Sequence, residues 1–400
     1  MSSPAPPSAA SSFATAASSS TGAPTARLDA PPLSLKQTFQ GRRLVVVGGT
    51  GFLGKVWLAL VLSRLPELEH IYLVVRPKEG LGVEERFAEK VLTTEVFQPL
   101  RDTHGAGFDE FVRSKVTPIA GDVADAFCGL SSSLRLAIRG RIDAIVNVAG
   151  IVDFDPPLDD ALRVNTFGCR NLVELARDLG ATGRAVPLLH TSTCFTAGSR
   201  TGHIQELDPR EIPFPKAGQL PISSWDPERE IVECQADVEE TRRTVTAQFD
   251  RVALSERARD HLGAPGAEPT EEDVAREVMR LEQKELTAAL SALGMERARR
   301  WGWPNTYTYS KSMGEQVIAR SGVPFCIVRP AIVESTLAFP FPGWNEGINT
   351  SAPFIFLIRQ GGLQVPGSSN NLDLIPCDLV CTALTLALAE LIEGRQKPVY

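Results

Sequence analysis

The sequence of 400 residues has no long hydrophobic run and no excess of basic residues. Its longest apolar stretches, such as Val56 to Leu62, are far shorter than the roughly 18 residues that a membrane-spanning helix needs. Lys and Arg total 41 and Asp and Glu total 48, so the net charge is −7. Because nucleic-acid backbones are bound by clustered Lys and Arg, this balance argues against a nucleic-acid partner. The composition, 43% hydrophobic and 22% charged, is typical of a globular protein.

Cysteine patterns that would indicate a disulfide framework or a zinc site are also missing. The seven cysteines are odd in number and form no CxxC pair, so no metal is expected. They are typical of reduced, buried thiols and favour a cytoplasmic protein over a secreted one. Residues 1–36 are rich in Ala, Ser, Thr and Pro, which predicts a disordered tail. This tail resembles a transit peptide only weakly, because Arg27 is its single arginine, so organelle targeting is the less favoured alternative.

From about residue 42 onwards, short β-branched runs alternate with helical patterns. Strands are predicted at 43–48, 70–75, 116–120, 144–148, 186–190 and 324–328, and helices at 52–65, 159–179 and 306–320. This alternation predicts βαβ units in an α/β fold, with a Rossmann-type, doubly wound parallel sheet that helices cover on both faces. The predicted folded domain spans residues 37–400.

A segment at about residues 207–301 breaks the alternation. It begins with Pro-rich loops and continues as a charged helical pattern, of which 271–293 carries apolar residues near helical spacing. We expect a helical insertion that packs on the sheet or forms a lid, with a solvated structural arm as the alternative. A further helix at 380–392 is apolar enough for peripheral membrane contact, although core packing is favoured.

The segment Gly48-Gly49-Thr50-Gly51-Phe52-Leu53-Gly54 lies between the first predicted strand and the first predicted helix. Glycine there allows a tight turn, a close approach of the backbone to a pyrophosphate, and close packing of helix on strand. The helix N-terminus adds free N–H groups and the positive end of the helix dipole. The sequence therefore predicts a dinucleotide-binding loop, and a purely structural turn is the alternative.

Residues at the ends of the next strands favour NADPH as the dinucleotide. The second strand ends without an acidic residue for the ribose 2′-OH and is followed by Arg76 and Lys78, which can pair with a 2′-phosphate. Arg76 could instead simply cap the sheet edge. Asp122 and Val123 follow the third strand, where the carboxylate could accept from the adenine amino group, and Ala149 follows the fourth, where a small residue leaves room for the ribose.

Tyr307 and Lys311 are four residues apart at the start of a predicted helix, so they share one face. A cation beside a phenol lowers the phenol pKa from about 10, and the tyrosine can then protonate a carbonyl oxygen as hydride arrives. The lysine can also hold the nicotinamide ribose. Thr193, with Ser192 as second choice, is the candidate hydroxyl for the developing oxyanion, although either could make only a strand-end hydrogen bond.

Several longer motifs resemble one known family. GGTGFLGK, IYLVVRPK, VNVAGIVDF, VNTFGCRNLVELA, TSTCF, WPNTYTYSKSMGE, CIVRPAIVES, PFPGWNEG and LDLIPCDLV occur in this order. From about Gln37 to Tyr400 the chain resembles the fatty acyl-CoA reductases, which belong to the extended short-chain dehydrogenase/reductase superfamily and carry a male-sterility type NAD-binding domain. The resemblance implies Tyr307 as proton donor, Lys311 as ribose ligand and Thr193 as third hydroxyl. It further implies a cofactor set of Gly48, Thr50, Gly51, Phe52, Leu53, Arg76 and Asp122, with Pro330 to Ile332 near the nicotinamide, and treats Asn165 as structural.

The implied function is NADPH-dependent reduction of a long-chain fatty acyl-CoA to fatty aldehyde or fatty alcohol, in a fold that includes a small substrate-binding subdomain. The alternatives are a reductase of a carrier-protein thioester, an enzyme that acts on a sugar nucleotide, and a non-catalytic NADP sensor. Family members continue into a helical C-terminal domain, which we expect to be absent because the chain stops at Tyr400, where a strand begins. The long insertion is expected to alter the substrate entrance, and the oligomeric state stays open.

Overall fold

A six-stranded parallel sheet forms the centre of the fold. The computed structural model describes residues 32–77, 80–181, 183–263, 269–347, 351–364 and 372–400. The strands are β1 Arg43–Val47, β2 His70–Val75, β3 Val116–Ala120, β4 Ala144–Asn147, β5 Leu188–Thr191 and β6 Phe325–Val328. Their order, β3-β2-β1-β4-β5-β6, reverses direction between β1 and β4. This order confirms the predicted Rossmann-type sheet, in which ligands bind at the carboxyl ends of the strands beside the reversal.

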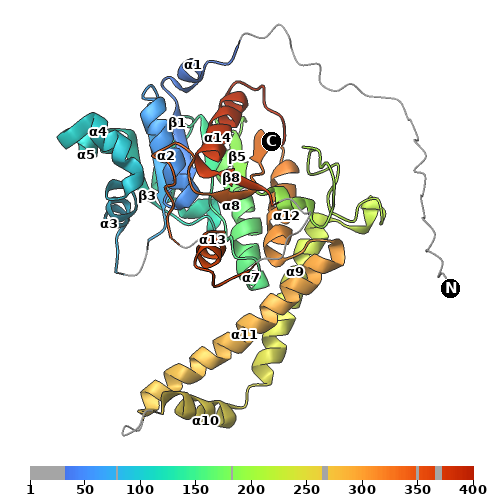
Figure 1. Ribbon diagram of the computed structural model, residues 1–400. Coiled ribbons are helices and arrows are strands. Elements are labelled where there is room, and N and C mark those ends of the chain that lie inside the picture. The colour runs from blue at the N-terminus through green and yellow to red at the C-terminus, as the bar shows by residue number, and fades with distance from the viewer. Residues whose placement is uncertain (1–31, 78–79, 182, 264–268, 348–350, 365–371) are drawn as a thin grey trace, which may run out of the picture. The chain divides into compact units, whose positions relative to one another are not determined.

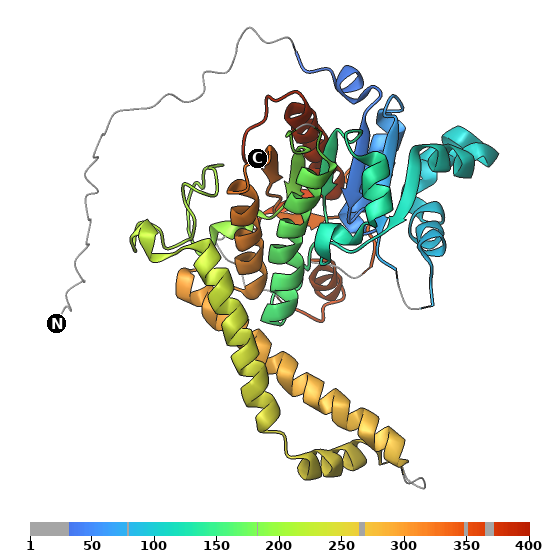
Figure 2. The ribbon, with the colours of Figure 1, turned by 180° about the vertical axis from the view of Figure 1, so that it is seen from behind.

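Helices cover both faces of this sheet (Figures 1 and 2). The helices α2 Phe52–Arg64 and α14 Cys377–Ile392 pack together in front of the sheet in Figure 1. The helices α6 Ser132–Ile138, α8 Phe167–Leu179 and α12 Thr306–Ala319 lie in front of it in Figure 2. The apolar helix predicted at 380–392 is therefore α14, and its inner face is buried in the core. Within the described part of the chain, none of the helices has the length and apolar character needed to cross a membrane.

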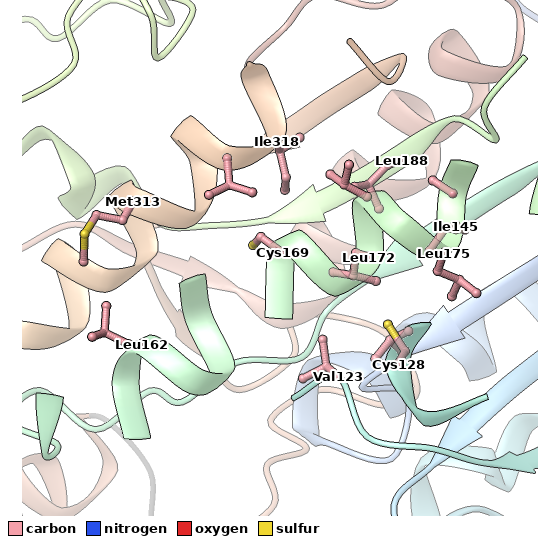
Figure 3. Packing of buried hydrophobic residues seen from close by; sticks show 14 of the residues in the cluster. Val123, Cys128, Ile145, Leu162, Cys169, Leu172, Leu175, Leu188, Met313 and Ile318 are labelled. Atoms are coloured by element: carbon pink, nitrogen blue, oxygen red, sulfur yellow. The ribbon is translucent and has the colours of Figure 1, made fainter. Parts of the chain in front are cut away.

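In the core, α8 packs against both the sheet and α12 (Figure 3). Cys169 and Leu172 of α8 contact a cluster that includes Leu188 of β5 and Met313 and Ile318 of α12, and each of these side chains is at most 1% exposed. Burial of one such apolar side chain contributes about 1.5–3 kcal/mol. The helix that carries Tyr307 therefore stands on a rigid apolar base.

The predicted helix at 159–179 is not continuous. It consists of α7 Leu158–Ala161, a π-helical turn Leu162–Thr166, and α8. The turn lies against α12, and a Cβ at Gly314 would lie 2.2 Å from the backbone oxygen of Asn165, so only glycine permits this approach. The hydroxyl of Thr166 also donates to the backbone oxygen of Ser310 at 3.0 Å.

The predicted insertion forms an arm of three helices, α9 Pro227–Ala247, α10 Arg251–Leu262 and α11 Glu271–Trp301. In both views α9 and α11 run side by side away from the sheet, and α10 lies at their far end (Figures 1 and 2). The far end has its own apolar cluster, which includes Leu254 and Leu281, and the base contacts α7 and α12. The arm is thus helical, as expected, and its action as a lid stays a prediction.

The remaining elements are short. They are α1 Leu35–Phe39, α3 Val83–Phe87 with a π-helical turn Ala88–Leu92, α4 Gln98–His104, α5 Phe108–Lys115, β7 Ile332–Glu334, α13 Ala352–Arg359 and β8 Leu374–Pro376. Strands β7 and β8 form a separate two-stranded parallel sheet. Helix α1 begins inside the predicted tail, and residues 1–31 lie outside the described residues. The expected terminal strand is represented by Val399, which forms a parallel bridge with Ile327 of β6.

Candidate active site

The glycine-rich loop connects β1 to α2 at the carboxyl end of the sheet. Gly48 has φ +89°, and a Cβ there would lie 2.4 Å from the backbone nitrogen of Ala149, so the loops after β1 and β4 touch. A Cβ at Gly49 would lie 2.4 Å from Leu73, and one at Gly54 would lie 2.3 Å from the Gly48 oxygen. Gly48 and Gly54 are therefore required by the close approach of backbone atoms, whereas a Cβ at Gly49 would meet the end of a side chain.

The fourth glycine of the loop has a different environment. Gly51 is exposed, has extended backbone angles and is the N-cap of α2, where it has no side chain to cap the helix. A Cβ at Gly51 would meet only the Gly48 oxygen, at 3.5 Å. The predicted ligands Thr50, Phe52 and Leu53 are half-buried around this turn. The first amides of α2 are thus presented without a side-chain cap, as an anion-binding helix N-terminus requires.

A buried polar pair joins the ends of β4 and β5. The side chain of Asn147 accepts from the Ala149 N–H at 3.1 Å, and its Nδ2 lies 2.9 Å from Nδ1 of His190. Because an amide nitrogen only donates, Nδ1 of His190 accepts and the ring is neutral. Burial, with a smaller effect of the Lys311 charge, keeps the pKa of His190 well below its usual value. Sequence reasoning assigned no role to this pair, although Asn147 falls within the VNVAG motif.

The predicted adenosine ligands lie at the ends of β2 and β3. Arg76 Nη1 lies 3.8 Å from Asp122 Oδ2, and the Arg76 side chain is 61% exposed. The other oxygen of Asp122 accepts from the Ala124 N–H at 3.0 Å. The side chain of Val123 is buried in the core, so only its backbone is available to a ligand. Lys78 lies outside the described residues.

Lys311 projects from α12 towards the ends of β4 and β5. Its Nζ donates to the backbone oxygen of Thr191 at 2.6 Å, and a Cβ on Gly150 would lie 3.4 Å from the same nitrogen. The residue is 4% exposed, and burial lowers the pKa of its amine. Asn305 caps α12 by accepting from the Thr308 N–H at 2.9 Å, which fixes the turn that carries Tyr307.

The phenol of Tyr307 is close enough to the side chain of Thr193 for the Thr193 hydroxyl to influence its pKa. Thr193 is 3% exposed, and its Oγ1 donates to the Pro330 oxygen at 3.4 Å and accepts from the Phe195 N–H at 3.3 Å. Burial raises the pKa of Tyr307 to about 12, against the smaller lowering effect of the Thr193 hydroxyl. The prediction that Lys311 lowers this pKa is therefore wrong for this structure, because desolvation of the phenolate is the larger effect. The phenol is consequently held in its proton-donating form.

Two hydroxyls beside this pair have no partner. The side-chain oxygens of Thr191 and Ser192 are buried and make no hydrogen bond among the described residues. A buried hydroxyl without a partner costs about 1–3 kcal/mol, so a ligand that hydrogen-bonds to it would be stabilised. Pro330 is buried beside them, with its oxygen accepting from the Cys194 N–H at 3.0 Å, and Ile332 is half-buried where β7 begins. The open helix N-terminus and these orphaned hydroxyls fit a dinucleotide coenzyme.

Two further residues beside the site had no predicted catalytic or binding role. Asn165 accepts from the Ile151 N–H at 3.0 Å and donates to the Ser310 hydroxyl at 3.0 Å, so it joins the loop after β4 to α12. Phe154 accepts from the Tyr307 N–H at 3.2 Å through its backbone oxygen, and the two rings are 6.2 Å apart. The only signal for these two residues in the sequence is that each falls within a motif, Asn165 in VNTFGCRNLVELA and Phe154 in VNVAGIVDF.

Comparisons with known proteins identify the family of this chain. Residues 46–384 match the NAD-binding family described as male sterility protein. The chain is 31% identical over 362 residues to fatty acyl-CoA reductase 2, chloroplastic, of Arabidopsis thaliana, which covers 90% of this chain and 52% of that protein. It is 28% identical over 360 residues to the alcohol-forming fatty acyl-CoA reductase of Simmondsia chinensis, covering 89% of this chain and 64% of that protein.

Among solved structures, the terminal R domain from the myxalamid PKS-NRPS biosynthetic pathway is similar with a TM-score of 0.51. It shares 19% sequence identity over 88% of this chain and 62% of that chain, which supports the fold alone. The chain spans between about half and two thirds of the length of the curated relatives named above. On the evidence of the matched family and of the fold, the chain belongs to the male sterility family of NAD-binding domains, as the sequence motifs predicted.

Proposed function

We propose that the protein is an oxidoreductase that reduces long-chain fatty acyl-CoA thioesters with NADPH. The observation that carries this proposal is the Tyr307 phenol close to the Thr193 hydroxyl, on a helix whose Lys311 reaches the same strand ends that meet the glycine-rich loop. This arrangement places a proton donor (Tyr307), a second hydroxyl (Thr193) and a buried cation (Lys311) beside a candidate dinucleotide-binding loop. This combination can protonate a carbonyl oxygen and stabilise the charge that develops on it during hydride transfer.

The side chains have separate tasks in the proposed reaction. When bound, NADPH supplies a hydride to the thioester carbonyl carbon. Tyr307 gives its proton to the carbonyl oxygen, and Thr193 donates a hydrogen bond to the same oxygen as charge develops there. Lys311 holds the nicotinamide ribose and, as a cation, helps to return a proton to Tyr307. Cleavage of the carbon–sulfur bond then releases aldehyde and the thiol, and a second reduction would give the alcohol.

Two features favour NADPH and a long acyl chain. The exposed guanidinium of Arg76 at the end of β2 is suited to a 2′-phosphate, and no acidic residue follows that strand directly. The Phe154 ring, which neighbours Tyr307, is 57% exposed, and Val152 is 74% exposed. Exposed apolar side chains next to the reacting group favour an aliphatic substrate over the sugar nucleotide considered above.

All seven cysteines are free thiols, which supports the proposed cytoplasmic location.

The test is product analysis by mass spectrometry after incubation of the protein with palmitoyl-CoA and NADPH. We expect hexadecanal or hexadecanol together with free CoA, and much slower reaction with NADH. Turnover of the same acyl group only on a carrier protein would replace acyl-CoA by the carrier thioester as substrate. Tight binding of NADPH without turnover of any thioester would favour the sensor and would contradict the proposal.

A further inference from the structure

The residues just before the motif PFPGWNEG meet the motif LDLIPCDLV at the carboxylate of Asp378, in the first turn of α14. One oxygen of Asp378 accepts from the Leu337 N–H at 2.8 Å, and the other accepts from the N–H groups of Ala338 and Phe339 at 2.9 and 3.0 Å. The residue is 5% exposed. Burial alone would raise its pKa, but the three backbone hydrogen bonds hold the pKa below its usual value. Asp378 therefore fixes three consecutive amides of one loop.

That loop, residues 336–346, is closed on itself, so its two ends move together. The Thr336 N–H donates to the Trp344 oxygen at 3.0 Å, and the Gly343 N–H donates to the Thr336 oxygen at 2.8 Å. The Thr336 hydroxyl donates to the Phe341 oxygen at 2.8 Å. A displacement of the amides that Asp378 binds would consequently displace Trp344 as well.

The far end of the 336–346 loop lies on the first turn of α2. The Trp344 ring is stacked on Phe52, with the ring centres 5.5 Å apart and the planes 12° apart. Glu346 forms an ion pair with Lys55, whose side chain is 1% exposed. Phe52 and Lys55 are three residues apart and share one face of the helix. A cation this deeply buried depends on its partner, because an unpaired buried charge costs several kcal/mol.

Helix α14 supports the same turn directly. The thiol of Cys381, one turn after Asp378, donates to the Leu53 oxygen at 3.6 Å. The first turn of α2 is therefore held by the 336–346 loop on one side and by α14 on another, and Asp378 joins the two supports. The amides of this turn are the group that would receive the coenzyme phosphates.

We propose that Asp378 is a positioning residue for coenzyme binding, acting through the 336–346 loop on the first turn of α2. The proposal rests on the proposed function, since it requires a dinucleotide on that turn. Its physical basis is that hydrogen bonds from helix amides to phosphate weaken steeply with displacement and misalignment of the donors. The support supplied by Asp378, Trp344 and Glu346 keeps those donors in place before the coenzyme arrives.

The first test is the NADPH dissociation constant of the Asp378→Asn variant, measured by titration of nicotinamide fluorescence. In Asp378→Asn one carboxylate oxygen is replaced by an NH₂ group, which donates and cannot accept from a backbone N–H. Up to two of the three hydrogen bonds from the loop are therefore lost. We expect the dissociation constant to rise by about tenfold, with smaller change in turnover at saturating NADPH. The matched control is Asp250→Asn in the arm, where the carboxylate accepts from the Val252 and Ala253 N–H groups at 2.9 and 3.2 Å. The control should bind NADPH as the wild type does.

If Asp378 had a merely structural role, Asp378→Asn and Asp250→Asn would both lower the melting temperature, and the affinity of the folded protein for NADPH would be unchanged. The Glu346→Gln variant provides a second measurement that leaves the Asp378 hydrogen bonds intact and weakens the contact with Lys55. It should also raise the dissociation constant. Unaltered NADPH affinity in both Asp378→Asn and Glu346→Gln, with a wild type that binds NADPH, would overturn the positioning role alone. A wild type that binds no dinucleotide would overturn the proposed function as well.

Discussion

Two alanine substitutions in the glycine-rich loop should separate folding from coenzyme binding. At Gly54 a Cβ would lie 2.3 Å from the Gly48 oxygen and 2.6 Å from the Gly49 Cα, so α2 must move away from the loop. Overpacking of this kind costs about 1–3 kcal/mol. Gly54→Ala should therefore lower both the stability of the protein and its affinity for NADPH.

Gly51→Ala should instead weaken NADPH binding and leave the stability of the protein nearly unchanged. The backbone of Gly51, at φ −83° and ψ 174°, suits any residue, and the added Cβ would meet protein only at 3.5 Å. The loss of glycine at an N-cap and the gain from a stiffer unfolded chain each amount to about 0.5–1 kcal/mol and nearly cancel. The methyl group would, however, stand in front of the α2 amides, where the pyrophosphate must approach closely.

The assay compares urea or thermal unfolding with NADPH titration for both variants. For Gly51→Ala we expect an unfolding free energy within about 1 kcal/mol of wild type and an NADPH affinity at least about tenfold weaker, which corresponds to about 1.4 kcal/mol. For Gly54→Ala we expect both quantities to fall. Wild-type NADPH affinity in Gly51→Ala would refute the assignment of this loop as the phosphate seat.

Three further outcomes are expected. Arg76→Ala should raise KM for NADPH about tenfold and leave KM for NADH unchanged. The control is Arg64→Ala, at another exposed arginine. Equal effects of Arg76→Ala on both coenzymes would exclude a 2′-phosphate contact. The pKa of Tyr307 is raised to about 12, above its unfolded value, so the neutral phenol contributes its full stabilisation below about pH 10 and this stabilisation is lost towards pH 12. For the same reason kcat/KM for NADPH should not fall between about pH 7 and 9. A decrease of kcat/KM in that range would be contrary evidence. Arg297→Met removes a cation that is only 8% exposed from the carboxylates that pair with it, and should lower the free energy of unfolding in urea by about 3–5 kcal/mol. Arg276→Met removes a cation that is 67% exposed on the same helix and should cost less than about 1 kcal/mol. Equal losses would show that burial of the ion pair is immaterial.

The parallel sheet could be predicted from the sequence because each strand is a short apolar run followed by glycine or polar residues. The bounds predicted for the strands at 70–75 and 116–120 agree with β2 and β3, and the others differ by no more than two residues. The helix at 159–179 was predicted as continuous because its apolar spacing hides the π-helical turn, in which Asn165 bonds Ile151 and Ser310. Such contacts join residues far apart in the sequence, and periodicity carries no information about them.

The candidate site shows the same division. The four-residue spacing of Tyr307 and Lys311 predicts a shared helix face, but it does not predict the depth of burial that raises the pKa of the phenol. The role of Asp378 could not be predicted at all, because its three partners lie about 40 positions earlier in the chain, with separations of 41, 40 and 39 residues. Local patterns therefore predicted candidate residues for the chemistry, and only the fold revealed which residues hold these candidates in place.

The central claim is that Tyr307 donates the proton to a carbonyl that NADPH reduces. The most direct measurement is single-turnover reduction of palmitoyl-CoA by Tyr307→Phe with NADPH bound, alongside an NADPH titration of the same variant. We predict an NADPH dissociation constant within about threefold of wild type and a loss in reduction rate of about 10²–10⁴-fold. Reduction by Tyr307→Phe at a near wild-type rate would contradict the claim.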